Sequence, residues 1–166
     1  MRCPFVWVMQ AVDYSEWVPM GRLVKGLVAM FVCLEVFISF TILYFDGLSM
    51  ESLVGVAIAW GILALIVFLF WNYRGLCIQV SDGRLTVTYG RFNKKSYALD
   101  DLASCKRTKA GFGRYFGIGV RYGTDGSVAY TTSFGDAVEV TPKEGQVFVF
   151  SSKQPDQVCR AINRAR

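Results

Sequence analysis

The sequence predicts a membrane α-helical hairpin followed by a small all-β barrel, in which about seven antiparallel strands are capped by a C-terminal helix. Two apolar stretches of equal length, residues 27–45 and 53–71, predict the hairpin. Short runs in which apolar and polar residues alternate begin at residue 74 and predict the strands. After Pro155 the spacing of apolar residues is helical again and predicts the cap.

The net charge of the chain changes sign close to the point where the apolar stretches end and the alternating pattern begins. Hydrophobic residues make up 53% of the sequence and charged residues 19%. Residues 1–71 carry three basic and five acidic side chains, a net charge of −2, whereas residues 72–166 carry fifteen and eight, a net charge of +7. A basic second half predicts that this part lies near something anionic, either lipid headgroups or nucleic acid.

The N-terminal residues 1–22 are rich in apolar and aromatic side chains, but they are too short and too interrupted to cross a membrane. Trp7 and Trp17 stand among valines, whereas Asp13, Glu16 and Pro19 break the apolar pattern. We expect an N-terminal interfacial segment that lies along the membrane, or alternatively a strand docked on the C-terminal domain.

Residues 23–72 form the predicted two-helix transmembrane hairpin. A bilayer core of about 30 Å requires roughly 20 apolar residues in a helix, and both apolar stretches approach that length. Residues 46–52 between them leave room for a tight turn only, so the helices must be antiparallel neighbours. The first stretch begins too far along the chain, and is too long, for a cleaved signal peptide.

The charges that flank the hairpin predict its orientation. Arg22 and Lys25 precede the first helix and Arg74 follows the second, whereas the turn carries only Asp46 and Glu51. Cytoplasmic segments next to membrane helices are enriched in lysine and arginine. We therefore expect a multi-pass protein of the cell (plasma) membrane with both termini cytoplasmic.

Glu35 is the one charged residue inside either apolar stretch. A carboxylate near the middle of a membrane costs on the order of 3 kcal/mol, so we expect a protonated side chain bonded across a helix contact. The alternative is a role in a proton or ion path. Because two helices cannot enclose such a path, this alternative requires a homo-oligomeric transport or channel assembly.

Residues 74–166 form the predicted β domain. We expect short strands at residues 76–80, 85–89, 97–99, 103–109, 120–122, 128–134, 137–141 and 147–150. Turn signals such as Asp82-Gly83 separate these runs. Pro155 is suited to the first turn of a helix in which Val158, Ile162 and Ala165 share one face.

Five motifs of this half resemble those of bacterial pleckstrin-homology-like (PH-like) domains. They are residues 78–91 (IQVSDGRLTVTYGR), 99–104 (LDDLAS), 113–119 (GRYFGIG), 135–140 (GDAVEV) and 148–152 (FVFSS). In that family such a domain often follows two membrane helices. The resemblance covers about residues 74–166 and implies a PH-like barrel whose C-terminal helix covers one open end. Its motifs concern the fold, so it implies no site residue.

No catalytic, cofactor or metal site is predicted. The sequence has no histidine, which removes the usual general base and the commonest metal ligand. The glycine-rich residues 111–119 lack the GKS/T of a phosphate-binding loop and the helix context of a dinucleotide site. The five cysteines are scattered without metal-ligand or disulfide spacing, so we expect reduced thiols that face a cytoplasm.

A cluster of basic residues is the candidate lipid-binding site. Its members are Lys106, Arg107, Lys109 and Arg114, and Phe112, Tyr115 and Phe116 stand between and beside them. Each cation close to an anionic membrane contributes about 1 kcal/mol, while the aromatic rings would dip into the interface. Alternatively, these charges only reflect orientation and solubility. A second basic patch comprises Arg91, Lys94 and Lys95.

These observations favour a non-enzymatic integral membrane protein whose cytoplasmic PH-like domain binds a protein partner or the anionic membrane surface. The expected partners are membrane lipids and either another protein or further copies of the chain. No nucleic acid and no small-molecule substrate are expected. The alternative function is that of a subunit in an oligomeric transport or channel assembly that uses Glu35.

Overall fold

The computed structural model describes residues 12–165, and it divides the chain into two compact units. Gly21–Asn72 form one unit, and the chain before and after this segment forms the other. The helical unit is thus inserted into the β unit rather than placed ahead of it. We describe each unit by itself.

The helical unit is a hairpin of α1 (Arg22–Phe45) and α2 (Met50–Asn72). Both helices are long and apolar enough to cross a membrane, with mean hydropathies of 2.3 and 2.8. Most of their side chains are exposed in the isolated chain, and buried ones such as Val24 and Leu63 are few. The indole of Trp60 donates a hydrogen bond to Ser39 Oγ across the pair, at 3.0 Å. The two predicted apolar helices are confirmed.

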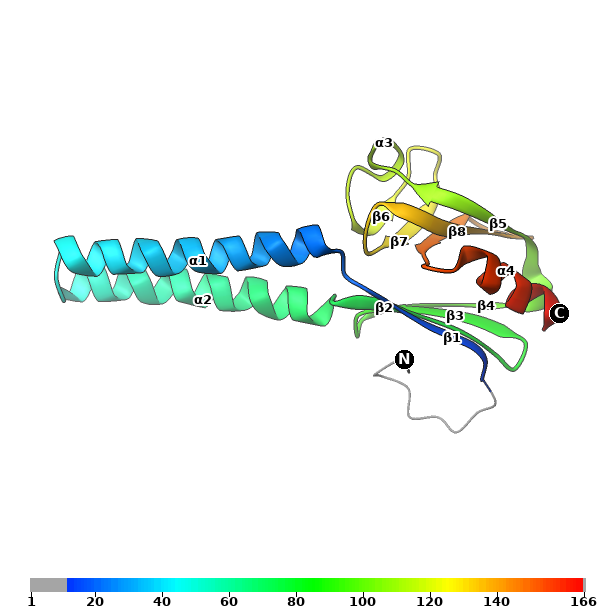
Figure 1. Ribbon diagram of the computed structural model, residues 1–166, viewed down its shortest axis with the longest axis horizontal. Helices are drawn as coiled ribbons and strands as arrows, with labels where there is room; N and C mark the ends of the chain where they lie inside the picture. Colours follow the sequence, from blue (N-terminus) through cyan, green and yellow to red (C-terminus); the bar gives the residue numbers. More distant parts are fainter. Residues whose placement is uncertain (1–11, 166) are drawn as a thin grey trace. The chain divides into compact units, whose positions relative to one another are not determined.

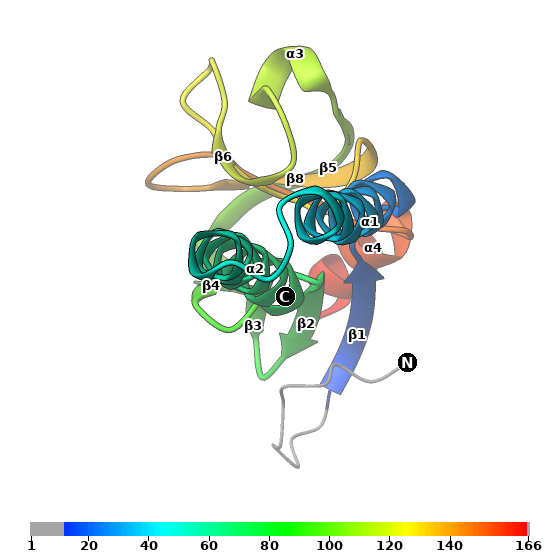
Figure 2. The same cartoon turned by 90° about the vertical axis from the view of Figure 1, so that its left-hand side faces the viewer.

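The first sheet of the β unit contains four antiparallel strands in the order β1-β2-β3-β4. Their bounds are β1 (Val12–Pro19), β2 (Gly75–Ser81), β3 (Arg84–Tyr89) and β4 (Asn93–Ala98). Figure 2 shows β2 between β1 and β3. Of the two expectations for residues 1–22, the docked strand holds for residues 12–19, and residues 1–11 lie outside the described part of the chain.

The strands β1 and β2 lie on either side of the hairpin in sequence, yet they pair along their whole length. The last residue of β1, Pro19, is opposite the first residue of β2, Gly75. A side chain at Gly75 would collide with the ring of Trp17. The two points where the β unit joins the helices are therefore next to each other at one end of this sheet.

The second sheet contains five strands in the order β5-β8-β9-β7-β6. Their bounds are β5 (Leu102–Ala110), β6 (Gly119–Tyr122), β7 (Val128–Thr131), β8 (Gly135–Pro142) and β9 (Phe148–Ser151). A short 3-10 turn, η1 (Leu99–Asp101), connects β4 to β5. All pairings are antiparallel except that of β7 with β9, which is parallel.

The predicted closed or nearly closed barrel of about seven antiparallel strands was wrong in its closure and its strand number. The described residues contain nine strands in two separate hydrogen-bonded sheets. Alternation of apolar residues reveals which face of a strand is buried, but not which edges pair. It also could not show that residues before the hairpin supply a strand of the same sheet.

The core lies between the inner faces of the two sheets and the helix α4 (Pro155–Arg164) (Figure 1). Leu76, Ile78 and Val87 of the first sheet are fully buried there. The second sheet contributes residues such as Phe148 and Phe150, and α4 contributes the buried side chains of Val158 and Ile162. The predicted C-terminal helix and its apolar face are confirmed.

The expectation of reduced cysteines was wrong for Cys77, Cys105 and Cys159, each of which is disulfide-bonded. Cys105 on β5 and Cys159 on α4 form a disulfide, with their Cα atoms 5.6 Å apart. The two residues are 54 positions apart in sequence, so no short cysteine spacing indicates that they pair. Folding brings them together because α4 packs against β5. Cys33 is a free thiol.

Candidate functional site

The alternation of side chains along β5 separates the basic residues that the sequence groups together. Arg107 and Lys109 share one face of the strand, and Lys106 lies on the other. Lys106 is opposite Glu139 on β8, whereas Arg107 is opposite the buried Val138. The predicted lipid-binding residues therefore do not form one surface.

Arg107 is engaged by two carboxylates of its own domain. Its guanidinium lies 3.1 Å from Asp136 and 3.5 Å from Asp156. The hydrogen bond to Asp136 and the charges of both carboxylates raise the pKa of Arg107. Because Asp156 belongs to the first turn of α4, this pair helps to fix the start of the helix on β5.

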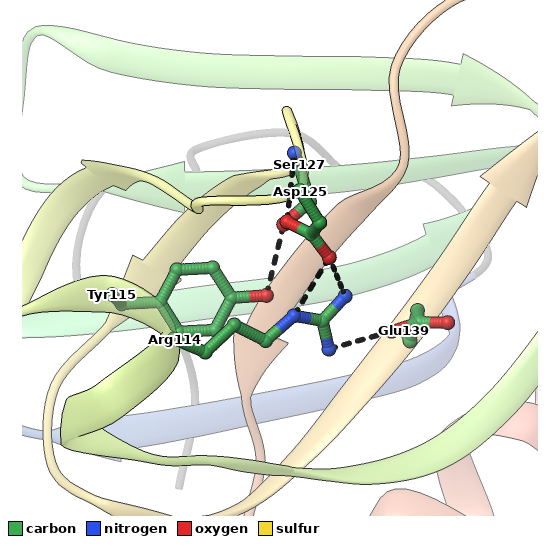
Figure 3. A network of polar contacts seen from close by, with 5 residues as sticks. All are labelled: Arg114, Tyr115, Asp125, Ser127 and Glu139. Carbon is green, nitrogen blue, oxygen red and sulfur yellow. Dashed lines mark hydrogen bonds and ion pairs between the residues drawn. The ribbon is translucent and has the colours of Figure 1, made fainter.

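Arg114 is engaged more completely (Figure 3). Its guanidinium donates to Asp125 at 2.6 and 2.9 Å and to Glu139 at 2.9 Å. Asp125 also accepts hydrogen bonds from the backbone and hydroxyl of Ser127, whose hydroxyl is 3.1 Å from that of the buried Tyr115. These bonds tie the segment between β5 and β6 onto the outer face of the second sheet.

The pKa of Asp125 falls to about 2 because Ser127 and Arg114 hydrogen-bond to its ionised form. The Ser127 hydroxyl is the largest cause. The guanidinium of Arg114 is thus paired with two carboxylates of its own domain. Only Lys106 and Lys109 of the predicted set are exposed without an ion pair to any described residue.

The glycine-rich segment after β5 presents aromatic rings to solvent. It contains the short helix α3 (Phe112–Tyr115). Phe112 and Phe116 are 62% and 64% exposed, and Phe112 is in edge contact with Phe116 and with Phe134. Tyr115 points the other way and is buried. Phe112 thus joins three exposed rings into one apolar patch.

Phe116 also adopts a left-handed backbone conformation, with φ at +49°. This region is unfavourable for bulky residues, and strained residues occur preferentially at functional sites. Glycine would fit that position without strain. The presence of an exposed phenylalanine there is a second reason to regard this patch as functional.

The patch lies at the end of the β unit where the helices are attached. The ring of Tyr89, at the end of β3, contacts Tyr73 and Tyr130, with centroids 5.4 and 6.1 Å away. Tyr130 is next to the last residue of β7, from which the chain runs directly to Phe134. Phe92 follows Tyr89 in the turn before β4 and is 75% exposed.

We call Phe92, Phe112, Phe116 and Phe134 the aromatic end. The sequence pattern singles out only Phe112 and Phe116, because Phe92 and Phe134 are distant from the basic cluster in sequence. Phe92 is a large apolar residue between two predicted strands, and Phe134 ends the strand predicted at residues 128–134. Lys94 and Lys109 are exposed near these rings, and neither forms an ion pair with a described residue.

Buried tyrosines connect the two sheets behind the aromatic end. The pKa of Tyr89 rises to about 12 because burial disfavours its anion and Tyr73 is nearby. Lys95, a member of the second basic patch, points between the sheets, with its ammonium 5.2 Å from the centre of the Phe148 ring. Burial lowers the pKa of Lys95. This lysine is therefore not part of the exposed surface.

Glu35 lies near the middle of α1, as the sequence indicates. Its Oε1 atom is buried and has no hydrogen-bond partner among the described residues. One turn further along the helix, Ser39 is satisfied by Trp60. The expected bond from Glu35 across a helix contact is therefore not formed by this atom.

Comparisons with known proteins give no relative, since no family model, curated protein or solved structure matches the chain. Within residues 12–165 no group of three or more histidine, cysteine, aspartate or glutamate residues is arranged to hold a metal ion. The candidate site is thus defined by its own geometry as a surface, the aromatic end.

Proposed function

We propose that this chain is a non-enzymatic integral membrane protein whose β domain binds the anionic surface of the membrane that holds its helical hairpin. The observation that carries the proposal is the position of the aromatic end. Exposed Phe92 follows Tyr89, which is paired with Leu76 beside Gly75 at the end of the first sheet. Tyr89 contacts Tyr130, near the end of β7 from which the chain runs to the exposed Phe134 and its neighbour Phe112. Exposed apolar patches commonly mark interaction sites, including sites for membranes.

The chemistry of this end suits a lipid interface. Its phenyl rings would enter the boundary between headgroups and acyl chains, where buried apolar area stabilises binding. Lys94 and Lys109 would remain at the level of the phosphates, each contributing about 1 kcal/mol. The basic residues predicted from sequence thus act in part, while Arg107 and Arg114 hold the fold.

The PH-like assignment and the cytoplasmic location of the β domain belong to this proposal. The motifs quoted above and the final helix on a β-rich unit support the former. Arg22, Lys25 and Arg74 support the latter through the enrichment of cations on the cytoplasmic side. The Cys105–Cys159 bond opposes it, because disulfides persist mainly in oxidising compartments.

Photo-crosslinking in the full-length protein tests lipid contact. Benzoylphenylalanine is placed at Phe116 or at Tyr122, and the protein is reconstituted in nanodiscs that contain anionic lipid. Tyr122 is a matched control because it is 74% exposed and ends β6 opposite Val128, at the other end of the sheet. We expect lipid adducts at position 116 and few at position 122.

Equal lipid labelling at the two positions would contradict the proposal. A protein adduct at position 116 in cell membranes, without a lipid adduct, would also contradict it and would identify a protein partner. Both outcomes are read by mass spectrometry of the crosslinked protein.

A second candidate function is a subunit of an oligomeric transport or channel assembly. The unpartnered Oε1 of Glu35 favours it, because an unsatisfied polar atom within a membrane is costly and is retained mainly for function. Glu35→Gln in liposomes loaded with a pH-sensitive dye tests this idea. Loss of a proton flux that the unaltered protein supports would establish it, and the absence of any flux would exclude proton transport.

A further inference from the structure

A hollow of about 430 Å³ lies between β1 and α4, in the β unit. Its floor contains Tyr14, Ala161 and Ala165, which are half-buried and pack against the main core. Asp13 approaches from β1, and Arg160 and Arg164 from α4. This volume is within the range of small-molecule sites in proteins.

The charged groups around this hollow do not neutralise one another. Arg160 uses its Nε to donate to the carbonyl of Asp156, at 3.2 Å, so its terminal amino groups are free of that bond. The side chains of Asp13 and Arg164 form no hydrogen bond or ion pair with the described residues. Two guanidinium groups one helical turn apart and one carboxylate thus face a common space.

Both walls of the hollow are held firmly. On β1 the hydroxyl of Tyr14 donates to Glu16, which also accepts from Ser152 and from the backbone of Lys153. On α4 the residue before Arg160 is Cys159, which is bonded to β5. Walls fixed in this way reduce the entropy that a ligand must overcome on binding.

We propose that this hollow binds a small amphoteric molecule, one that carries a phosphate or carboxylate group and an ammonium group. The anionic group would be held by Arg160 and Arg164, since paired guanidinium groups match the oxygens of such anions. The ammonium group would lie at Asp13, and the linker between them on Tyr14. This ligand is bound without being transformed, so it differs from the small-molecule substrate that the sequence gives no reason to expect.

This inference does not depend on the aromatic end. Asp13 lies near the start of β1, away from the Pro19 end to which the helices are joined. No residue of the hollow belongs to the aromatic end, so either proposal can fail while the other holds.

Calorimetric titration of the full-length protein in phosphatidylcholine nanodiscs tests the site. The probes are O-phosphoethanolamine and β-alanine, with inorganic phosphate and ethanolamine as their fragments. We expect saturable binding of at least one amphoteric probe, and weaker binding of both fragments. The same titration in phosphatidylethanolamine discs distinguishes two sources of the ligand. If the site binds a lipid headgroup, the phosphatidylethanolamine competes and the apparent affinity for the probe falls. If the site binds a free molecule, the affinity is the same in both kinds of disc.

Variants locate the binding. The double variant Arg160→Gln with Arg164→Gln should lower the affinity for the probe about tenfold or more, because charged hydrogen bonds are lost. Asp13→Asn should weaken the amphoteric probe but not inorganic phosphate. Lys143→Gln removes an exposed cation outside the hollow and should leave the affinity for the probe unchanged. Thermal unfolding of each variant checks that it folds.

Absence of saturable binding for both amphoteric probes would overturn the proposal. So would unchanged affinity in the double arginine variant. Unchanged affinity in Asp13→Asn would overturn the amphoteric character of the ligand.

Discussion

The disulfide between Cys105 and Cys159 closes a loop of 54 residues and joins α4 to β5. Cys159→Ser opens that loop and leaves the buried contacts of Val158 and Ile162 in place. For a loop of this length the loss of chain entropy in the unfolded state is worth about 4 kcal/mol. In a domain of this size such a loss lowers the unfolding temperature by roughly 15 °C or more.

A protein without the hairpin suits this measurement. Because Pro19 and Gly75 are paired neighbours, a short Gly-Ser linker can replace residues 21–72 and join the two parts of the β unit. Urea unfolding of this hairpin-deleted protein, with and without Cys159→Ser, gives the difference in free energy. Ala161→Ser is the matched control, since it adds a hydroxyl to a half-buried position on the same helix.

A loss of less than about 1 kcal/mol, or one no larger than that of the control, would refute this reasoning. It would mean that this disulfide does not stabilise the folded protein as the loop-closure argument requires. Mass spectrometry after alkylation reads the redox state of the same samples directly.

Three further predictions concern the stability of the core, the loss of stability at low pH, and the side of the membrane on which the β domain lies. Phe148→Ala removes a fully buried ring that contacts three other rings, so urea unfolding should show a cost of about 3–5 kcal/mol; the exposed Phe92→Ala should cost less than about 0.5 kcal/mol. Because the pKa of Asp125 falls from 3.8 to about 2, its contribution to stability is complete above the unfolded pKa and is lost as the pH drops toward 2. Ser127→Ala should shrink that loss in unfolding measured against pH, and an unchanged pH profile would contradict it. A green fluorescent protein fused to the C-terminus should fluoresce in cells, whereas an active alkaline phosphatase fusion would place the β domain on the oxidising side.

The helices and most of the strands could be predicted because they follow from local pattern. A long apolar run has few stable conformations other than a helix, which is why α1 and α2 appear where expected. Alternation identified the inner faces of β2 and β3. The helical spacing of Val158 and Ile162 identified the buried side of α4.

The remaining features depend on residues that are distant in sequence. The role of residues 12–19 is decided by β2, which lies beyond the entire hairpin. Asp125 and Glu139 neutralise Arg114 only because a turn and a neighbouring strand bring their carboxylates to it. A count of charges along the chain includes the cations but does not show which carboxylates pair with them. It therefore overestimates the exposed basic surface.

Only part of the aromatic end could be predicted from the sequence, for the same reason. Phe112 and Phe116 stand beside the basic cluster in the sequence. Their exposure results from the conformation of the short helix α3. Phe134 joins them only through the pairing of Ala110 with Gly135, which places the two chain segments side by side. Pairing of this kind is not visible in a single sequence.

Flotation of the hairpin-deleted protein with liposomes tests the central claim most directly. The liposomes contain anionic lipid at about physiological salt, and the comparison protein carries Phe112→Ser and Phe116→Ser, with its fold checked by thermal unfolding. We predict that the unaltered β unit floats with the liposomes and that the serine variant remains in the dense fraction. If the unaltered unit does not float, or if both proteins float equally, the aromatic end does not bind the membrane surface and the proposed function is contradicted.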